Sequence, residues 1–216
     1  MSKKYLVTGA AGFIASQVSK QLLDQGDHVV GVDNLNNYYD IRLKNWRLDQ
    51  LKVHTNAHNL FFANLDIEDQ AKLANLFLEE GPFDAVLNLA ARAGVRYSME
   101  NPHVYFSTNA EGTLNLLECM RAHGCNKLVL ASTSSLYAGQ KMPFTEDLAV
   151  NEPLSPYAAS KASSDRPSTR SKRQISTLAL FITLFSGLES IILFKRVSFC
   201  GTPLLSLFRI ESLKIL

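Results

Sequence analysis

Five short runs of β-branched and apolar residues alternate along the chain with amphipathic segments, and this alternation most limits the possible folds. The runs lie at about residues 4–8, 28–33, 59–64, 84–90 and 126–132. Strands separated by helices usually form a parallel sheet that helices cover on both faces. We therefore expect an α/β fold with a doubly wound parallel sheet.

A glycine motif follows the first of these runs and opens a helical segment, at residues 8–15 (TGAAGFIA). Gly9 permits a tight turn, and Gly12 lets the backbone approach a pyrophosphate that the free N–H groups at the helix start would bind. This context predicts the dinucleotide-binding loop of a Rossmann-type sheet, with Gly9, Gly12, Phe13 and Ile14 at the cofactor. A glycine turn that binds no ligand is the alternative.

A carboxylate ends the second run, and another follows the third. Asp33 comes about 20 residues after the glycine loop, where a carboxylate accepts hydrogen bonds from an adenosine ribose. Because Asp33 would repel a 2′-phosphate, we predict NAD rather than NADP, with a simple loop cap as the alternative. Asp66 and Ile67 would lie beside the adenine, although Asp66 fits a helix N-cap equally well.

Tyr157 and Lys161 lie four residues apart, so a helix places them on one face. Thr133 lies at the carboxyl end of the fifth run, where open parallel sheets bind ligands. We predict a proton-transfer site in which Thr133 orients a hydroxyl group and Tyr157 removes its proton. Lys161 and an oxidised nicotinamide are expected to lower the pKa of Tyr157. Lys161 as a solvated surface charge is the alternative.

Composition limits the partners and the compartment. The chain has 22 basic and 20 acidic residues, a balance that predicts neither nucleic acid nor a membrane surface as a partner. Three cysteines, Cys119, Cys125 and Cys200, lack metal-ligand spacing, so we expect neither a disulfide framework nor a metal site. With no room for a signal peptide before the first strand, a cytoplasmic location is predicted.

The motifs together resemble the extended short-chain dehydrogenase/reductase family, in particular its NAD-dependent epimerases and dehydratases, and most closely the UDP-glucuronate 4-epimerases. The resemblance covers about residues 3–162. It is carried by VTGAAGFIAS (7–16), GVDNLNNYYDIRLK (31–44), LNLAARAGVRYSMENP (87–102) and SPYAASK (155–161).

The resemblance implies a reaction and its residues. A bound NAD would reversibly oxidise C4 of a UDP-sugar, with Thr133, Tyr157 and Lys161 as the catalytic triad. Further cofactor contacts implied by the family are Asn34, Leu89, Ala90, Ala91 and Asn109, and substrate contacts are Arg96 and Ser134. Asn109 as a helix polar residue and Arg96 as a surface charge are equally good alternatives. The family also implies a homodimer.

The residues after Thr133 separate two reactions of this family. Related sugar 4,6-dehydratases carry an acid pair directly after the catalytic threonine, whereas here Ser134 and Ser135 follow it. The resemblance therefore favours an epimerase over a dehydratase.

Residues 1–162 are predicted to form the NAD-binding domain, and 163–216 a divergent tail. The tail begins with a polar basic stretch in which Pro167 would end a helix, and 187–194 resembles the family's sixth strand. Our hypothesis is that the reading frame of the encoding DNA is disrupted in this tail, so that the C-terminal substrate domain is missing or aberrant. The rivals are a catalytically inactive NAD-binding fragment and a dehydrogenase anchored to a membrane by 178–194, a segment short for a span of about 20 residues.

Overall fold

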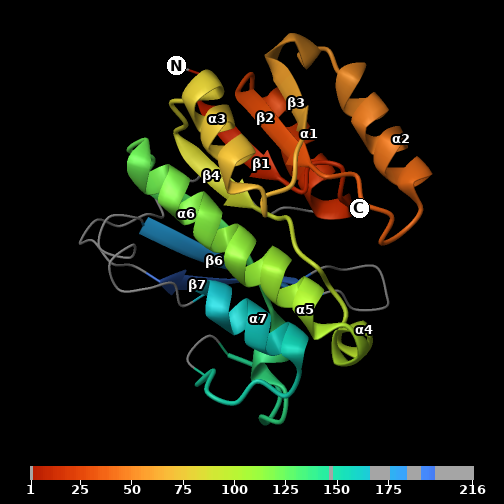
Figure 1. Cartoon of the computed structure of the whole chain (residues 1–216), viewed down its shortest axis with the longest axis vertical. Helices are drawn as coiled ribbons and strands as arrows, with labels where there is room; N and C mark the ends of the chain where they lie inside the picture. Colours follow the sequence, from red (N-terminus) through yellow and green to blue (C-terminus); the bar gives the residue numbers. More distant parts are fainter. Residues whose placement is uncertain (1, 146–147, 166–175, 184–190, 198–216) are drawn as a thin grey trace.

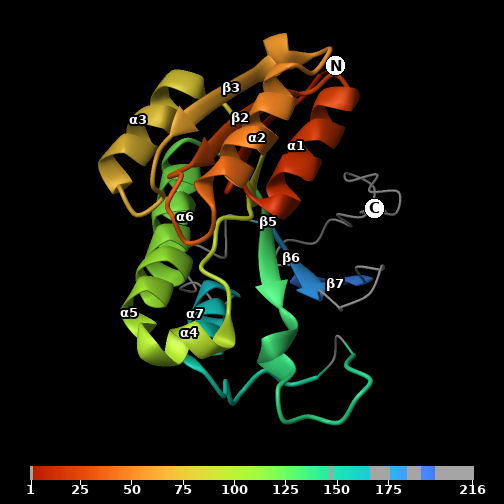
Figure 2. The ribbon, with the colours of Figure 1, turned by 90° about the vertical axis from the view of Figure 1, so that its right-hand side faces the viewer.

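The computed structural model describes residues 2–145, 148–165, 176–183 and 191–197. Its centre is a sheet in the strand order β3-β2-β1-β4-β5-β6-β7 (Figure 1; β5 is labelled in Figure 2). The strands are β1 (Lys4–Thr8), β2 (His28–Asp33), β3 (Leu60–Asn64), β4 (Ala85–Asn88), β5 (Lys127–Thr133), β6 (Ser176–Thr183) and β7 (Ile191–Val197). All neighbours pair in parallel except β6 and β7. The predicted Rossmann-type fold is confirmed, and the first five strands agree with the sequence prediction within two residues at each end.

Helices lie on both faces of the sheet. Figure 2 shows α1 and α2 on one side, and α3 and α6 on the other. The helices are α1 (Phe13–Asp24), α2 (Ile41–Lys52), α3 (Gln70–Glu80), α4 (Val95–Glu100), α5 (Pro102–Tyr105), α6 (Gly112–Ala122) and α7 (Pro156–Asp165). A π-helical segment, Phe106–Glu111, joins α5 to α6, and 3₁₀ turns cover Ala57–Asn59 and Ser134–Tyr137.

Each of the first five strands contributes to two hydrophobic cores because successive side chains point to opposite faces. Leu6 packs with residues of α3 and α6, such as Phe77 and Met120. Its neighbour Val7 packs on the other side, with Leu23 of α1. This explains why the strands appear in the sequence as continuous apolar runs: both faces of the parallel sheet are buried.

The sixth strand differs from the sequence prediction. The strand beside β5 is β6, which pairs with it from Lys127 opposite Ser176 to Thr133 opposite Ile182. Of the predicted 187–194 strand, residues 191–194 belong to the antiparallel β7 and 187–190 lie outside the described residues. Both segments are short apolar runs, and a hydrophobic pattern alone does not determine which of them pairs with β5.

The end of α7 also differs from the sequence prediction. The helix continues through Asp165, so the predicted boundary after residue 162 lies inside it. Pro167 lies outside the described residues. In the described part of the chain, no helix is both long and apolar enough to cross a bilayer.

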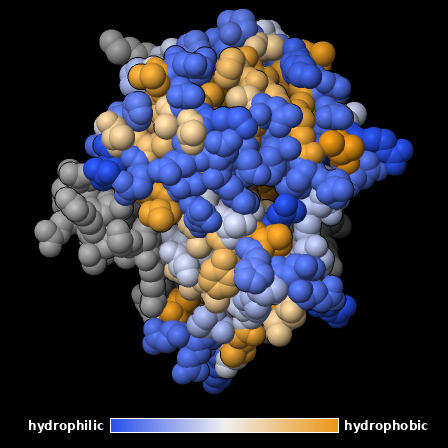
Figure 3. Space-filling model, in the orientation of Figure 1, coloured by the Kyte–Doolittle hydropathy of each residue, from blue (hydrophilic) through white to orange (hydrophobic). Residues whose placement is uncertain are grey.

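The visible surface is mixed in character. Figure 3 shows hydrophobic side chains in separate patches among hydrophilic ones. Cys119 and Cys125 are buried free thiols, whose pKa values burial raises, and Cys200 lies outside the described residues. Neither described cysteine is therefore placed to act as a surface nucleophile.

Candidate dinucleotide and catalytic site

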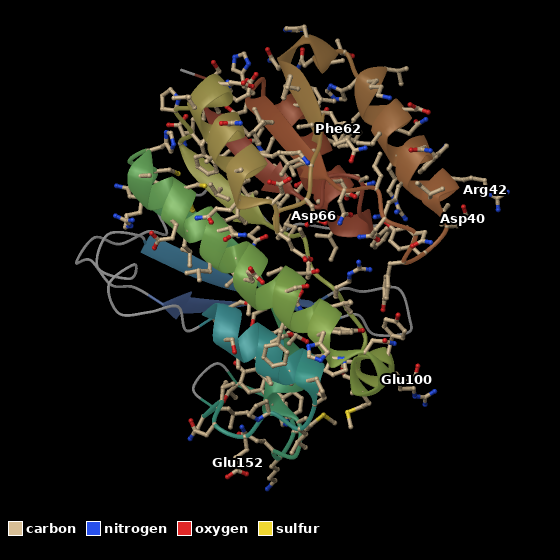
Figure 4. The ribbon with its side chains drawn as sticks, in the orientation of Figure 1. Asp40, Arg42, Phe62, Asp66, Glu100 and Glu152 are labelled. Atoms are coloured by element: carbon tan, nitrogen blue, oxygen red, sulfur yellow. The ribbon has the colours of Figure 1, made fainter. Side chains whose placement is uncertain are left out.

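A cleft lies at the carboxyl ends of β1, β2, β3 and β4, where open parallel sheets bind their ligands. It brings together these residues predicted from the sequence: Gly9, Gly12, Asp33, Asn34, Asp66, Ile67, Leu89, Ala90 and Ala91. Figure 4 shows Asp66 near the middle of the molecule, and the Asp40–Arg42 pair at the outer end of α2, away from it. The cleft therefore collects contacts predicted separately from four loops.

The glycine loop approaches the β4 loop so closely that side chains are excluded. Gly9 has φ +70°, and a Cβ on it would lie 2.9 Å from the backbone Cα and N of Ala90. A Cβ on Gly12 would lie 2.9 Å from the carbonyl oxygen of Gly9. Helix α1 begins directly after Gly12 without a side-chain cap and without an acidic residue in its first turn. A glycine cradle in front of such a helix start fits a phosphate group.

Asp33 is held by three donors at the end of β2. Its Oδ2 accepts from the Ala11 amide at 3.2 Å, and its Oδ1 accepts from the Leu35 amide at 2.8 Å and from Lys44 Nζ at 3.2 Å. Sequence reasoning missed Lys44, which is buried on α2 and also lines the cleft. Because the lysine neutralises the carboxylate, charge repulsion of a 2′-phosphate is weaker than for an isolated aspartate.

Asp66 does not cap a helix. The N-cap of α3 is Asp69, whose side chain accepts from the Lys72 amide at 3.0 Å. Asp66 instead accepts from Asn34 Nδ2 at 2.6 Å and from the Glu68 amide at 3.0 Å. The helix-cap alternative is therefore wrong, and Asp66 and Asn34 together form one polar wall of the cleft.

Asn109 joins two segments that flank the cleft. It lies in the π-helical segment, and π-bulges often occur at functional sites. Its Oδ1 accepts from the Arg92 amide at 2.8 Å, while its Nδ2 donates to the Arg92 carbonyl at 3.1 Å and to Ser160 Oγ at 3.0 Å. The side chain therefore holds the loop after β4 against α7, and direct contact with a cofactor stays a prediction.

Two of the predicted catalytic residues, Thr133 and Tyr157, meet where β5 ends, and Lys161 lies on the same helix as Tyr157. Thr133 is the last residue of β5, and Tyr157 and Lys161 lie on α7. A hydrogen bond joins Tyr157 to Thr133, and the Tyr157 ring packs edge-on against Tyr105 with centroids 5.9 Å apart. Lys161 is only 3% exposed, so the solvated-charge alternative is wrong.

Burial dominates the electrostatics of this group. It raises the pKa of Tyr157, an effect that the Thr133 hydrogen bond opposes and the charges of Asp165 and Tyr38 reinforce. It lowers the pKa of Lys161, which the charge of Asp165 raises in turn. The described residues alone therefore do not produce the lowered Tyr157 pKa expected from the sequence. Asp165, which the sequence analysis assigned to the tail, also accepts from Ser132 Oγ at 2.6 Å.

Eight predicted residues lie outside the cleft lining: Asn109, Thr133, Tyr157 and Lys161, described above, and four others. Arg96 is exposed on α4, and Ser134 begins the 3₁₀ turn after β5. Phe13 is 48% exposed, with its ring 5.7 Å from the Arg47 guanidinium. Ile14 is half-buried on α1. Their roles stay predictions.

The cleft also has lining residues that the sequence analysis did not identify. They include Asn36, Tyr38, Tyr39, Lys44, Arg92 and Thr108. Most lie in the DNLNNYYDIRLK and AARAGVRYS stretches that carry the family resemblance. The family resemblance could have pointed to these residues, but it does not indicate which side chains of an irregular loop face a ligand. Within the described residues, no group of three or more His, Cys, Asp or Glu side chains is placed to hold a metal ion.

The fold, the glycine loop and the Thr, Tyr and Lys group define an extended short-chain dehydrogenase/reductase. The chain belongs to the GDP-mannose 4,6 dehydratase family, whose model matches residues 6–191.

Comparison with curated proteins and solved structures gives more specific relatives. A UDP-glucuronate 4-epimerase of Thermodesulfobacterium geofontis is 57% identical over 157 residues, which are 73% of this chain and 47% of that protein. The UDP-glucuronic acid 4-epimerase of Bacillus cereus, solved with UDP-glucuronic acid and NAD, has a TM-score of 0.74 at 32% identity, covering 84% of this chain and 57% of that one.

A dehydratase is also similar in structure. The dTDP-glucose 4,6-dehydratase DesIV of Streptomyces venezuelae, solved with NAD and TYD bound, has a TM-score of 0.67 at 31% identity, covering 81% of this chain and 53% of that one. The chain spans about half the length of the curated relatives it matches.

Proposed function

We propose that this chain carries the NAD-binding and proton-transfer half of a nucleotide-sugar 4-epimerase, with UDP-glucuronate as its substrate. The observation that carries the proposal is the hydrogen-bonded pair of Thr133 and Tyr157, with buried Lys161 on the same helix, beside a cleft built for a dinucleotide. The names of the similar proteins support the substrate class.

The described residues fit NAD. The space that a Cβ on Gly9 or Gly12 would fill is kept open, as a pyrophosphate requires. Within the described residues Asp33 Oδ2 has one donor, the Ala11 amide, and it can accept from a ribose hydroxyl as well. Bound NAD would supply reversible hydride transfer at the sugar C4. Gly9, Gly12, Asp33, Asn34 and Asp66 would hold it.

The chain's own residues would move the proton. Because burial raises the pKa of Tyr157, its phenol is protonated at neutral pH and can donate to an oxygen on the sugar. Taking up a proton from the C4 hydroxyl requires the phenolate, which the Thr133 hydrogen bond stabilises. In this scheme Thr133 orients the reacting hydroxyl, and Lys161 provides positive charge near the phenol.

The residues after Thr133 favour an epimerase. Ser134 and Ser135 occupy the positions where the resemblance leads us to expect an acid pair in a dehydratase. Ser135 instead bonds back to Thr133, with its amide donating to Thr133 Oγ1 at 3.2 Å. Elimination of water needs an acid at the sugar, and neither serine supplies one at neutral pH.

The test is turnover of UDP-glucuronate by the purified chain with NAD, followed by chromatographic separation of the C4 epimers. Epimerisation that Tyr157→Phe abolishes supports the proposal. NAD binding without epimerisation supports the rival, an NAD-binding protein without catalytic activity. A 4-keto-6-deoxy product would instead show a dehydratase, and absence of NAD binding contradicts both the proposal and its rival. A homodimer and a cytoplasmic location stay predictions, which gel filtration and cell fractionation would test.

A further inference from the structure

Among the described residues, Arg92 is the lysine or arginine of the cleft lining that no carboxylate pairs with. The other lysine or arginine of the lining, Lys44, pairs with Asp33 at 3.2 Å. Asp66 takes its hydrogen bonds from Asn34 and a backbone amide rather than from a cation. Among the described residues, Arg92 forms no ion pair with a carboxylate.

The fold holds Arg92 firmly in place. Asn109 hydrogen-bonds both the amide and the carbonyl of Arg92, at 2.8 and 3.1 Å. The guanidinium carbon lies 5.6 Å from the centroid of the Tyr38 ring, in cation–π contact. Tyr38 itself donates to the Ala93 carbonyl at 2.5 Å, which joins the loops after β2 and β4.

One donor of this guanidinium has no hydrogen-bond partner within the described part of the chain. Arg92 Nε is buried and makes no hydrogen bond to any described residue. A buried donor without a partner is costly, so natural proteins rarely leave one in place unless a ligand or water satisfies it. The side chain lines the same cleft as the glycine loop. An anionic ligand in this cleft would supply the missing acceptor.

We propose that Arg92 binds the diphosphate group of the nucleotide held in this cleft. The inference rests on the proposed function. A diphosphate carries negative charge that the start of α1 balances only in part, because a helix N-terminus provides about half a positive charge. Arg92 lines the same cleft as Gly9 and Gly12, and its planar fork of N–H donors suits phosphate oxygens.

The diphosphate could belong to the dinucleotide or to the nucleotide sugar. Arg92 shares its cleft with the glycine loop and with Asp33, and these are the dinucleotide contacts of the proposed function. Its guanidinium lies over Tyr38, which belongs to the loop that follows Asp33. We therefore assign the contact to the dinucleotide.

The experiment is calorimetric titration of the full chain with NAD, ADP, adenosine and UDP. The variants are Arg92→Gln and Arg92→Lys. Arg42→Gln is the matched control, because Arg42 is exposed on α2 and, among the described residues, pairs with Asp40 alone (Figure 4). Loss of a charge-assisted hydrogen bond should weaken NAD and ADP binding by about tenfold or more in Arg92→Gln. Adenosine affinity should be unchanged, Arg92→Lys should recover part of the loss, and Arg42→Gln should match the wild type.

Each other outcome has a defined meaning. Equal weakening of ADP and adenosine overturns the proposal, because Arg92 would then act only through the shape of the site. Unchanged NAD affinity with weakened UDP binding overturns the assignment to the dinucleotide. If the wild-type chain binds ADP but not NAD, the proposed function is contradicted. The role of Arg92 is then still tested by the ADP affinities of the variants. Circular dichroism would show whether Arg92→Gln folds. If it does not, the same NAD, ADP and adenosine titrations are compared between Arg92→Lys and the wild type, because lysine keeps the charge and loses the planar fork: weaker ADP binding with unchanged adenosine binding supports the proposal, and unchanged ADP binding overturns it.

Discussion

Lys44 Nζ lies 3.2 Å from Asp33 Oδ1 beside the cleft, and both side chains are only 6% exposed. The pair joins the end of β2 to α2, which otherwise contacts the sheet through apolar residues such as Leu51. A charged pair with so little access to water depends on both partners, because either charge alone would be buried without compensation.

Replacing Lys44 with methionine should therefore destabilise the fold. Removing one partner of a buried pair costs about 3 kcal/mol or more in the free energy of unfolding, measured by urea denaturation. Lys52→Met is the matched control, because the Lys52–Asp49 pair on the same helix is exposed and should change stability by less than about 0.5 kcal/mol. Adding Asp33→Asn to Lys44→Met should restore part of the loss. Equal effects of the two lysine substitutions would contradict this view of the pair.

Asn109→Ala should destabilise the protein and loosen the loop after β4. The substitution removes three hydrogen bonds and leaves the backbone groups of Arg92 without partners, which should cost about 2–3 kcal/mol. Amide hydrogen exchange should increase at residues 90–95 more than in α3. Ser163→Ala, which removes one exposed hydroxyl on α7, is the control and should leave exchange of that loop unchanged.

Alanine substitutions at Gly9 and Gly26 distinguish the cost of backbone strain from the cost of steric overlap. Both have positive φ, +70° and +78°, but a Cβ on Gly9 would strike Ala90 while one on Gly26 meets nothing within 4 Å. Gly26→Ala should cost about 1–2 kcal/mol from its backbone conformation alone. Gly9→Ala should cost clearly more and abolish NAD binding, as thermal unfolding and calorimetry would measure. Similar losses in both variants would mean that the Ala90 contact adds nothing.

Tyr5 should make the fold sensitive to alkaline pH. Burial, with the charges of Asp27 and Asp84, raises the pKa of Tyr5 to about 12. An unfolded tyrosine loses its proton near pH 10. The folded chain keeps that proton to higher pH, so the stability it contributes is complete below pH 10 and is lost as pH rises toward about 12.

Tyr5→Phe tests this dependence while keeping the ring. Wild type and variant should unfold at the same urea concentration at pH 8. Between pH 10 and about 12, the wild type should lose about 1–2 kcal/mol more than the variant. Parallel pH profiles would show that Tyr5 stays protonated equally in both states.

The pattern of the sequence determined the first five strands, the glycine loop and the position of the site residues relative to these strands. Asp33 ends one apolar run and Thr133 follows another. Because the carboxyl ends of parallel strands meet at one edge of the sheet, local periodicity alone predicts that the two residues lie at the same edge. Tyr157 and Lys161 share a face because of helical spacing.

Only the tertiary structure decided which side chains complete the site. Lys44 pairs with Asp33, Asn109 holds Arg92, and Arg92 lies over Tyr38 through contacts between separate segments. Such pairings depend on how loops turn and how helices pack, which local spacing does not encode. The same reason explains the sixth strand: either of two apolar runs could pair with β5, and hydrogen bonding across the sheet selected Ser176–Thr183.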